Sequence, residues 1–143
     1  MKSAVVSVLA LAILFSDNIA HAQNSIQCDG VVSILRISNY LESGSEEGLR
    51  EASDKHDAWY KSHGVTENKQ VVIPILQYEE DTDSLVKDSG SVATLHLKSD
   101  ASTAAREHQG DLLWNEFIAL YNKNTKVTDT LFLCIPESLF SSQ

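Results

Sequence analysis

Four side chains that can bind a ligand or move a proton lie within residues 56–63: His56, Trp59, Tyr60 and His63. Their spacing in the segment DKHDAWYKSHG is that of an amphipathic helix. At about 100° per residue, both histidines and the tyrosine share one stripe, and Trp59 flanks it. His56 and Tyr60 stand at positions i and i+4, where their rings can touch. An imidazole titrates near neutral pH, so this pair can position a molecule or accept its proton.

The same helix face also fits a purely structural role. Polar rings that are buried in a core need hydrogen-bond partners, and His63 in the last turn would interact well with the helix C-terminus. A core face normally carries Leu, Ile or Val at such positions, whereas two histidines and a tyrosine suit a cavity with polar requirements. Core and pocket are therefore equally supported interpretations of this face.

Metal and cofactor chemistry find little support in the sequence. His56 and His63 would lie about 10 Å apart along a helix axis, which is too far for both to bind one ion. The motifs CxxC and H-E-x-x-H do not occur, nor does a G-x-S-x-G elbow or a glycine-rich phosphate loop. We expect no metal site and no resident cofactor.

The hydrophobic pattern predicts the elements that would position this helix. Strands are predicted over 31–38, 70–79, 91–98 and 130–136. Helices are predicted over 46–63 and 112–123, with a less regular helical piece within 99–111. Ser43 or Ser45 can cap the first helix, and Asp111 can cap the second. The order β-α-β-β-α-β predicts an α+β, ferredoxin-like sandwich whose antiparallel four-stranded sheet has the order 4-1-3-2.

Three residues that play no part in that argument support the strand order. The first and fourth strands would be adjacent and antiparallel, which brings Cys28 close to Cys134. In an oxidising compartment we expect these two cysteines to form a disulfide. Pro74 cannot donate a ladder hydrogen bond and belongs on an edge strand, and the second strand is at an edge in this order.

The N-terminus predicts export. Lys2, an apolar run and the residues AHA before Gln23 are typical of a signal peptide, residues 1–22, cleaved between Ala22 and Gln23. Residues 23–143 then form one domain, which we expect to be periplasmic or secreted. The net charge of −9 argues against nucleic acid or an anionic membrane surface as a partner.

A single β-α-β-β-α-β unit whose first helix ends in WYKSHG resembles the dimeric α/β-barrel superfamily. This superfamily includes antibiotic-biosynthesis monooxygenase-like, haem-degrading and stress-responsive barrel domains. The resemblance is architectural and covers about residues 30–136. It implies a homodimer whose sheets pack face to face, and a pocket between each sheet and its own helices. Haem-degrading members set an Asn on the first strand and a His on the second helix; here Asn39 follows that strand, and His108 precedes that helix.

Arg36 and His96 form a second candidate group, on the two central strands of the predicted sheet. We expect both to face the partner subunit as a polar patch, because a buried arginine needs a partner. The candidate ligand site comprises the helix face and one residue at its mouth: His56, Trp59, Tyr60, His63 and Asn39.

These observations predict an exported, disulfide-linked homodimer that binds a small, partly apolar molecule. The resemblance adds a cofactor-independent oxygenase or isomerase activity as an option. Two alternatives remain open. The first is a non-catalytic binding or stress-accessory protein in which the helix face is core, and the second is a periplasmic haem-binding protein that uses one of the histidines.

Overall fold

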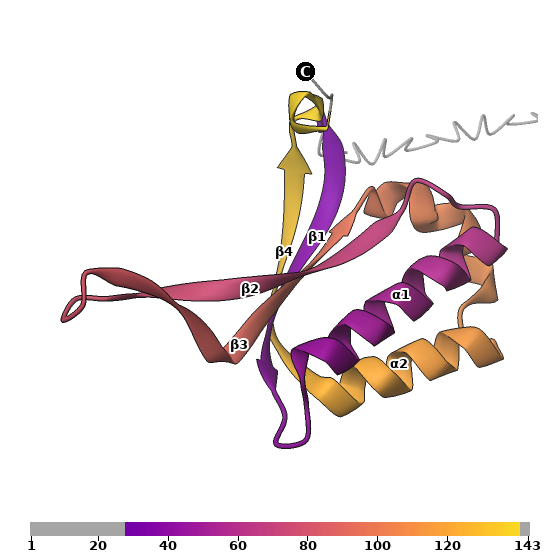
Figure 1. Ribbon diagram of the computed structural model, residues 1–143. Helices are drawn as coiled ribbons and strands as arrows, with labels where there is room; N and C mark the ends of the chain where they lie inside the picture. The colour runs from indigo at the N-terminus through magenta and orange to yellow at the C-terminus, as the bar shows by residue number, and fades with distance from the viewer. Residues whose placement is uncertain (1–27, 141–143) are drawn as a thin grey trace, which may run out of the picture.

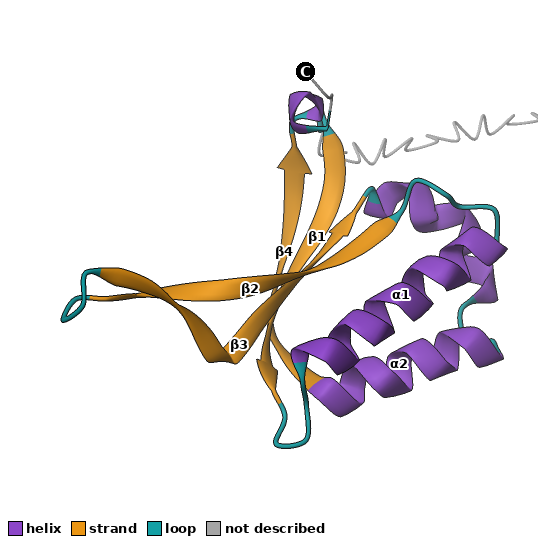
Figure 2. Cartoon of the chain, viewed as in Figure 1, coloured by secondary structure: helices purple, strands orange, loops and turns teal. Residues whose placement is uncertain are grey.

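Apolar strands and amphipathic helices alternate along the chain in the order that the sequence predicts. The computed structural model describes residues 28–140, and the expected signal peptide, residues 1–22, lies outside the described residues. One four-stranded sheet carries both helices on the same face (Figures 1 and 2). The elements in chain order are β1 (Val31–Tyr40), α1 (Glu46–Ser62), β2 (Lys69–Glu79), β3 (Ser84–Leu97), the 3-10 segment η1 (Ser99–His108), α2 (Leu112–Asn124), β4 (Thr125–Ile135) and the 3-10 turn η2 (Glu137–Leu139).

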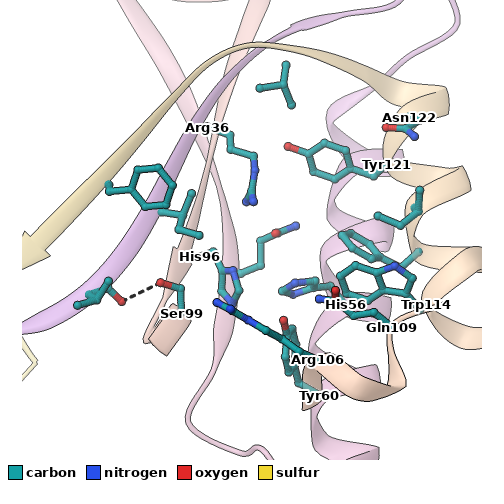
Figure 3. Close-up of a pocket in the computed structure, with 17 residues that line it drawn as sticks. Arg36, His56, Tyr60, His96, Ser99, Arg106, Gln109, Trp114, Tyr121 and Asn122 are labelled. Atoms are coloured by element: carbon teal, nitrogen blue, oxygen red, sulfur yellow. Dashed lines mark hydrogen bonds between the residues drawn. The ribbon is translucent and has the colours of Figure 1, made fainter. Parts of the chain in front are cut away.

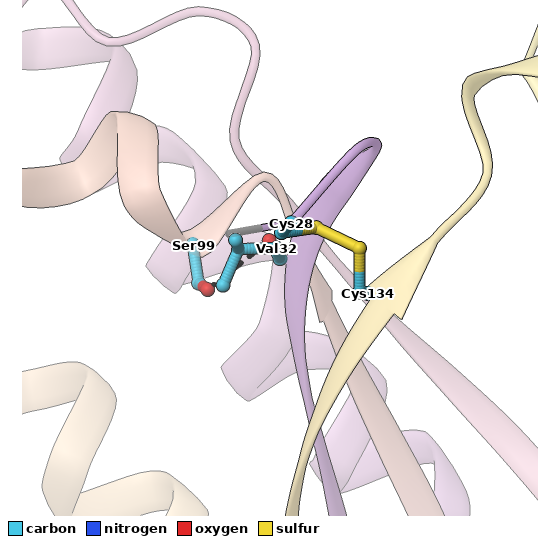
Figure 4. The surroundings of a disulfide bond; sticks show 4 residues. All are labelled: Cys28, Val32, Ser99 and Cys134. Atoms are coloured by element: carbon cyan, nitrogen blue, oxygen red, sulfur yellow. Dashed lines mark hydrogen bonds between the residues drawn. A yellow bond between two sulfur atoms is a disulfide. The ribbon is translucent and has the colours of Figure 1, made fainter. Parts of the chain in front are cut away.

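The strand order β2-β3-β1-β4 confirms the ferredoxin-like α+β fold. All neighbouring strands are antiparallel. Pro74 lies on the edge strand β2, as predicted, and the register of β2 shifts just after it. The start of β1 lies beside the end of β4, and Cys28 and Cys134 form the expected disulfide there, with Cα atoms 5.6 Å apart (Figure 4). Within the described chain, no helix has the length and apolar character needed to cross a membrane.

Two strands begin earlier than the sequence predicts. β3 starts at Ser84, where Leu85 already pairs with β2, so residues 84–90, between two predicted strands, belong to a long hairpin arm with a short turn. β4 starts at Thr125, directly after α2, and Val127 pairs with the end of β1. Polar side chains suggested loops at both places. A ladder of backbone hydrogen bonds extends the sheet there, and side-chain polarity alone does not report such pairing.

Side-chain caps fix the starts of both helices. Ser45 caps α1, and Ser43 does not, because the Ser45 hydroxyl accepts a hydrogen bond from the backbone N–H three residues later. Gly64 follows the helix end with a left-handed φ of +80°, which glycine adopts without strain. Asp111 caps α2 as predicted, since its carboxylate accepts from the Trp114 N–H at 2.7 Å. The uncertain segment before it is the 3-10 segment η1.

The two faces of the sheet differ in what they pack against. Between the sheet and the helices lies a core built from Leu49, Val72, Val92, Phe117 and Tyr121. The opposite face, which we call the outer sheet face, follows from the alternation of side chains along each strand. It carries Leu35 and Ile37 on β1, Ala93, Leu95 and Leu97 on β3, Val71 and Ile73 on β2, and Leu131 and Leu133 on β4.

Asn124, the last residue of α2, holds the start of α1 in place. Its side-chain Oδ1 accepts from the Ser45 N–H at 3.0 Å, and its backbone carbonyl accepts from the Leu41 N–H at 3.0 Å. Gly44 approaches this carbonyl so closely that a Cβ added to it would lie 1.9 Å from the oxygen. The turn before α1 therefore has no room for a side chain at Gly44.

We expect Gly44→Ala to lower the free energy of unfolding by about 2 kcal/mol, which is typical of forcing a methyl group into filled space. Urea unfolding followed by circular dichroism measures this loss. Gly90→Ala is the matched control, because a Cβ at Gly90 meets nothing closer than a carboxylate oxygen of Asp88 at 3.4 Å. Wild-type stability in Gly44→Ala would contradict the close contact.

Candidate functional site

A cavity of about 610 Å³ lies between the sheet and the helices (Figure 3). Every strand contributes to its lining, as do both long helices and η1. Its volume falls within the range of small-molecule sites, which are concave and mostly formed before the ligand arrives. The fold thus places a preformed space at the helix–sheet interface.

The lining of this cavity divides into an apolar and a polar part. The apolar part comes mainly from α2 and the β1–β4 pair: Val32, Ile34, Trp114, Phe117, Ile118, Val127 and Phe132. The polar part comes mainly from α1, η1 and the central strands: Arg36, His56, Tyr60, Gln70, His96 and Arg106. A ligand that fits both parts must be amphipathic.

His56 on α1 lies at the centre of a cluster of rings. Its centroid is 4.7 Å from each of the rings of Tyr60, His96 and Phe117. The residue is only 3% exposed, and its Nδ1 lies 3.6 Å from the Asp57 carboxylate, beyond hydrogen-bonding distance. Burial lowers the pKa of His56 against the opposing effect of Asp57. The ring is therefore neutral at pH 7.

His96 on β3 contacts His56 edge to face and also lines the cavity. The side-chain amide of Asn68 donates a hydrogen bond to Nε2 of His96. Burial is the main cause that lowers the pKa of His96 to about 3, and the neighbouring His56 and Arg36 act in the same direction. A pKa this low keeps the imidazole neutral across the physiological range. Both histidines thus serve as neutral hydrogen-bonding groups.

Hydrogen bonds hold other polar groups of the cavity in place. The Gln70 side chain donates to the Ser53 hydroxyl at 3.1 Å, and the Gln70 backbone N–H donates to the Asp57 carboxylate at 2.8 Å. The hydroxyls of Tyr121 and Thr94 lie 3.0 Å apart and join α2 to β3. Because these bonds link helices to strands, the polar side of the cavity is organised in advance.

Two arginines supply the charge of the cavity. Arg36 is half-buried on β1, and Arg106 is exposed at the end of η1 (Figure 3). None of the described residues that line the cavity is an aspartate or glutamate. Across residues 28–140, neither arginine forms an ion pair with a carboxylate. The cavity is therefore electropositive in a chain whose net charge is −9.

Of the five predicted ligand-site residues, the structure brings His56 and Tyr60 to the cavity and places the other three elsewhere. Trp59 is fully buried beside it, and its indole N–H donates to both oxygens of the Asp111 carboxylate at 3.0 Å. His63 lies past the end of the cavity and approaches the same carboxylate at 3.4 Å.

Asn39 also lies outside the cavity. It is exposed near the end of β1, where its Oδ1 accepts a hydrogen bond from the Ser91 hydroxyl at 3.4 Å. Asn39 and His108 lie near opposite ends of α2, because β1 ends beside Thr125 whereas His108 precedes the helix. His108 stacks on His63 with a centroid distance of 4.4 Å. The Asn–His pair of haem-degrading barrels is therefore not assembled from these two residues.

The expected orientation of Arg36 and His96 was wrong. Both side chains line the cavity beneath the helices, where a partner subunit packed on the outer sheet face would not reach them. The paired positions Ile34 and His96 share one face, which also carries the buried Val92 and Thr94. The more polar of the two sheet faces is thus the inner one, because it forms the wall of a cavity.

Sequence reasoning missed Arg106, Gln70 and Tyr121 as cavity residues. Arg106 lies in the irregular segment η1, whose 3-10 geometry has no clear hydrophobic period. Gln70 is the first residue of the predicted strand 70–79, which was recognised by its apolar residues and not by its polar ones. Tyr121 recurs with Trp114 and Phe117 at helical spacing, a pattern that indicates core, and all three in fact line the cavity.

In the described part of the chain, no group of three or more His, Cys, Asp or Glu side chains is placed to hold a metal ion. The polar side chains of the cavity are arginines, glutamines, neutral imidazoles, two phenols, an asparagine and a serine, which suit hydrogen bonding to an organic molecule. No protein-family model matches the chain, and a search of curated proteins finds no match to its sequence.

Proposed function

We propose that this domain binds a small, partly apolar molecule in the cavity between its helices and its sheet. The observation that carries the proposal is a 610 Å³ cavity whose apolar wall of aromatic and branched side chains faces a wall of fixed polar groups. Such a combination is typical of ligand sites, in which apolar contact supplies affinity and a few polar groups fix orientation.

The electrostatics of the cavity favour binding over proton transfer. A general base works best when its pKa lies near the working pH, and burial lowers the pKa of His96 to about 3. The pKa of His56 is lowered for the same reason. An oxygenase or isomerase that uses these histidines as bases is therefore the less supported form of the proposal.

Haem binding is also less supported. Nε2 of His96 already interacts with Asn68, and the accessible pair His63 and His108 stacks outside the cavity. A haem titration separates this alternative from ours, because ligation would give a Soret shift that disappears in a histidine variant.

A bulky residue in the cavity tests the proposal. The neutral dye N-phenyl-1-naphthylamine fluoresces in apolar sites, and we expect the wild type to enhance its emission. Ile118→Trp fills the cavity and should abolish most of this enhancement, whereas Ala119→Trp adds the same ring at an exposed position next to it. Equal enhancement by both variants would place the dye elsewhere and contradict the proposal.

We propose further that two copies pair through the outer sheet face. Strands about 4.8 Å apart and the ten residues of β1 give this face a flat area of roughly 600 Å². A stable interface buries about 800 Å² of accessible surface per partner, and the area of this face is of that order. Its branched apolar side chains suit self-association, which would bury them.

Sedimentation velocity tests the pairing, with an expected mass of twice the single chain. Leu95 pairs with Leu35 at the centre of the outer sheet face, so Leu95→Glu should give a monomer. Leu112→Glu is the control, because Leu112 is an exposed leucine on α2, which packs against the other face. A monomeric wild type at micromolar concentration would refute the pairing.

Export to an oxidising compartment is the third part of the proposal. The disulfide between Cys28 and Cys134 fits an extracellular or periplasmic location, since such bonds are rare where glutathione keeps thiols reduced. The sequence of residues 1–22 supports the same location. N-terminal sequencing of the exported protein should begin at Gln23.

A further inference from the structure

We propose that the ligand of this cavity is an organic carboxylate, with its anionic group held by Arg36 and its apolar body against α2. This inference rests on the proposed function and names the chemical class of the ligand. Its basis is a cavity in which positive charge and apolar surface meet without an opposing carboxylate.

Arg36 is the more buried of the two arginines that line the cavity. It is half-buried in the centre of the sheet, yet forms no ion pair with any carboxylate of residues 28–140. Proteins rarely bury a charge without a partner, because desolvation is costly. In Figure 3 the Arg36 side chain extends into the cavity from β1. An anion supplied from solution would complete this site.

Arg106 adds a second positive charge at the rim. It enters the same cavity from η1, on the side where the chain is exposed (Figure 3). An exposed cation contributes less to affinity than a partly buried one, because water and salt screen it. Arg106 therefore guides the anion inward, and Arg36 holds it.

The neighbouring groups define which anion fits. A guanidinium binds a carboxylate through two parallel hydrogen bonds, which gives orientation as well as charge. The two histidines nearby are neutral, so they add no charge to that of the two arginines. The opposite wall consists of Trp114, Phe117 and Ile118, which fits an aromatic or branched hydrocarbon body. One charge at one end of an apolar body describes a monocarboxylate more closely than a phosphate dianion.

A matched pair of probes tests the charge directly. 2-Naphthoate and 2-naphthamide share one apolar body and differ in charge, and quenching of tryptophan fluorescence reports binding beside Trp114. We expect the wild type to bind naphthoate at least roughly tenfold more tightly than naphthamide, as one charge-assisted hydrogen-bonded pair allows. Equal affinity for the acid and the amide would overturn the inference. Tighter binding of 2-naphthyl phosphate would overturn the carboxylate class.

Arginine variants identify which residue causes the preference for naphthoate over naphthamide. Arg36→Gln should bind naphthamide as the wild type does and lose the preference for naphthoate, and Arg106→Gln should lose only part of it. Arg50→Gln is the control, because Arg50 is exposed on α1 and pairs with Glu46. Arg36→Lys keeps the charge without the paired hydrogen bonds, so it should retain an intermediate preference.

The outcomes separate the two proposals. An Arg36→Gln variant that keeps the full preference for naphthoate would overturn the role of Arg36, and so would loss of that preference in Arg36→Lys while naphthamide still binds. If neither probe binds the wild type, the carboxylate class and the cavity as a ligand site fail together. If naphthamide binds and naphthoate binds no more tightly, the carboxylate class fails, but the cavity remains a ligand site.

Discussion

Replacing Cys28 and Cys134 together with serine is expected to lower the free energy of unfolding by about 4 kcal/mol, because the bond closes a loop spanning nearly the whole domain. Their separation of 106 residues is among the longest that a chain of this size permits. Cross-linking such distant residues removes many conformations of the unfolded chain. For a domain of ordinary stability, 5–15 kcal/mol on the general scale, about 4 kcal/mol is a large share.

Urea unfolding with and without dithiothreitol measures this effect. Reduced wild type and the double serine variant should have the same lowered midpoint, and the variant should not respond to the reductant. Both should also bind N-phenyl-1-naphthylamine less well, because the bond holds the end of β4, whose Phe132 lines the cavity. A wild-type midpoint that dithiothreitol leaves unchanged, with the bond shown to be broken, would contradict the account.

Acid should begin to destabilise the protein at a pH well above the pH range in which carboxylates titrate. Burial lowers the pKa of His96 from 6.5 to about 3, and the pKa of His56 moves in the same direction. Below pH 6.5 the unfolded imidazole takes up a proton that the folded one does not. The unfolded state then binds more protons, so the free energy of unfolding falls as pH falls from about 6.5 towards 3.

The slope approaches about 1.4 kcal/mol per pH unit for a histidine that is protonated in the unfolded state and neutral in the folded one. Between pH 6.5 and 5 we therefore expect a loss of about 1.6 kcal/mol from His96, with a further loss from His56. Urea unfolding at several pH values measures the slope. His96→Gln should reduce this slope, because the variant has no imidazole at that position to take up a proton on unfolding. Constant stability from pH 7.5 to 5 would show that these rings are not buried as described.

The architecture could be predicted from the sequence because several independent patterns agree on it. The apolar runs define four strands, and Pro74 and the two cysteines fit one strand order, which the structure confirms. The early starts of β3 and β4 could not be predicted in the same way. Polar residues such as those before Leu85 can join a ladder through their backbone, and composition does not report this.

Several candidate residues lie elsewhere than the sequence predicted, for physical reasons. Alternation along a strand separates two faces but does not say which one the helices cover. Here the outer sheet face, with Leu35 and Leu95, is the more apolar, so Arg36 and His96 were assigned to the wrong side. On α1 the periodicity is correct, but Tyr60 is the last residue of the helix that lines the cavity. His63 thus shares the stripe of His56 without reaching the cavity.

A crystal structure of the protein with 2-naphthoate tests the central claim most directly. We expect naphthoate between the helices and the sheet, with its carboxylate within hydrogen-bonding distance of the Arg36 guanidinium and its rings against Trp114 and Phe117. Naphthoate bound only on the outer sheet face, or a helix–sheet space filled by the protein's own side chains, would contradict it.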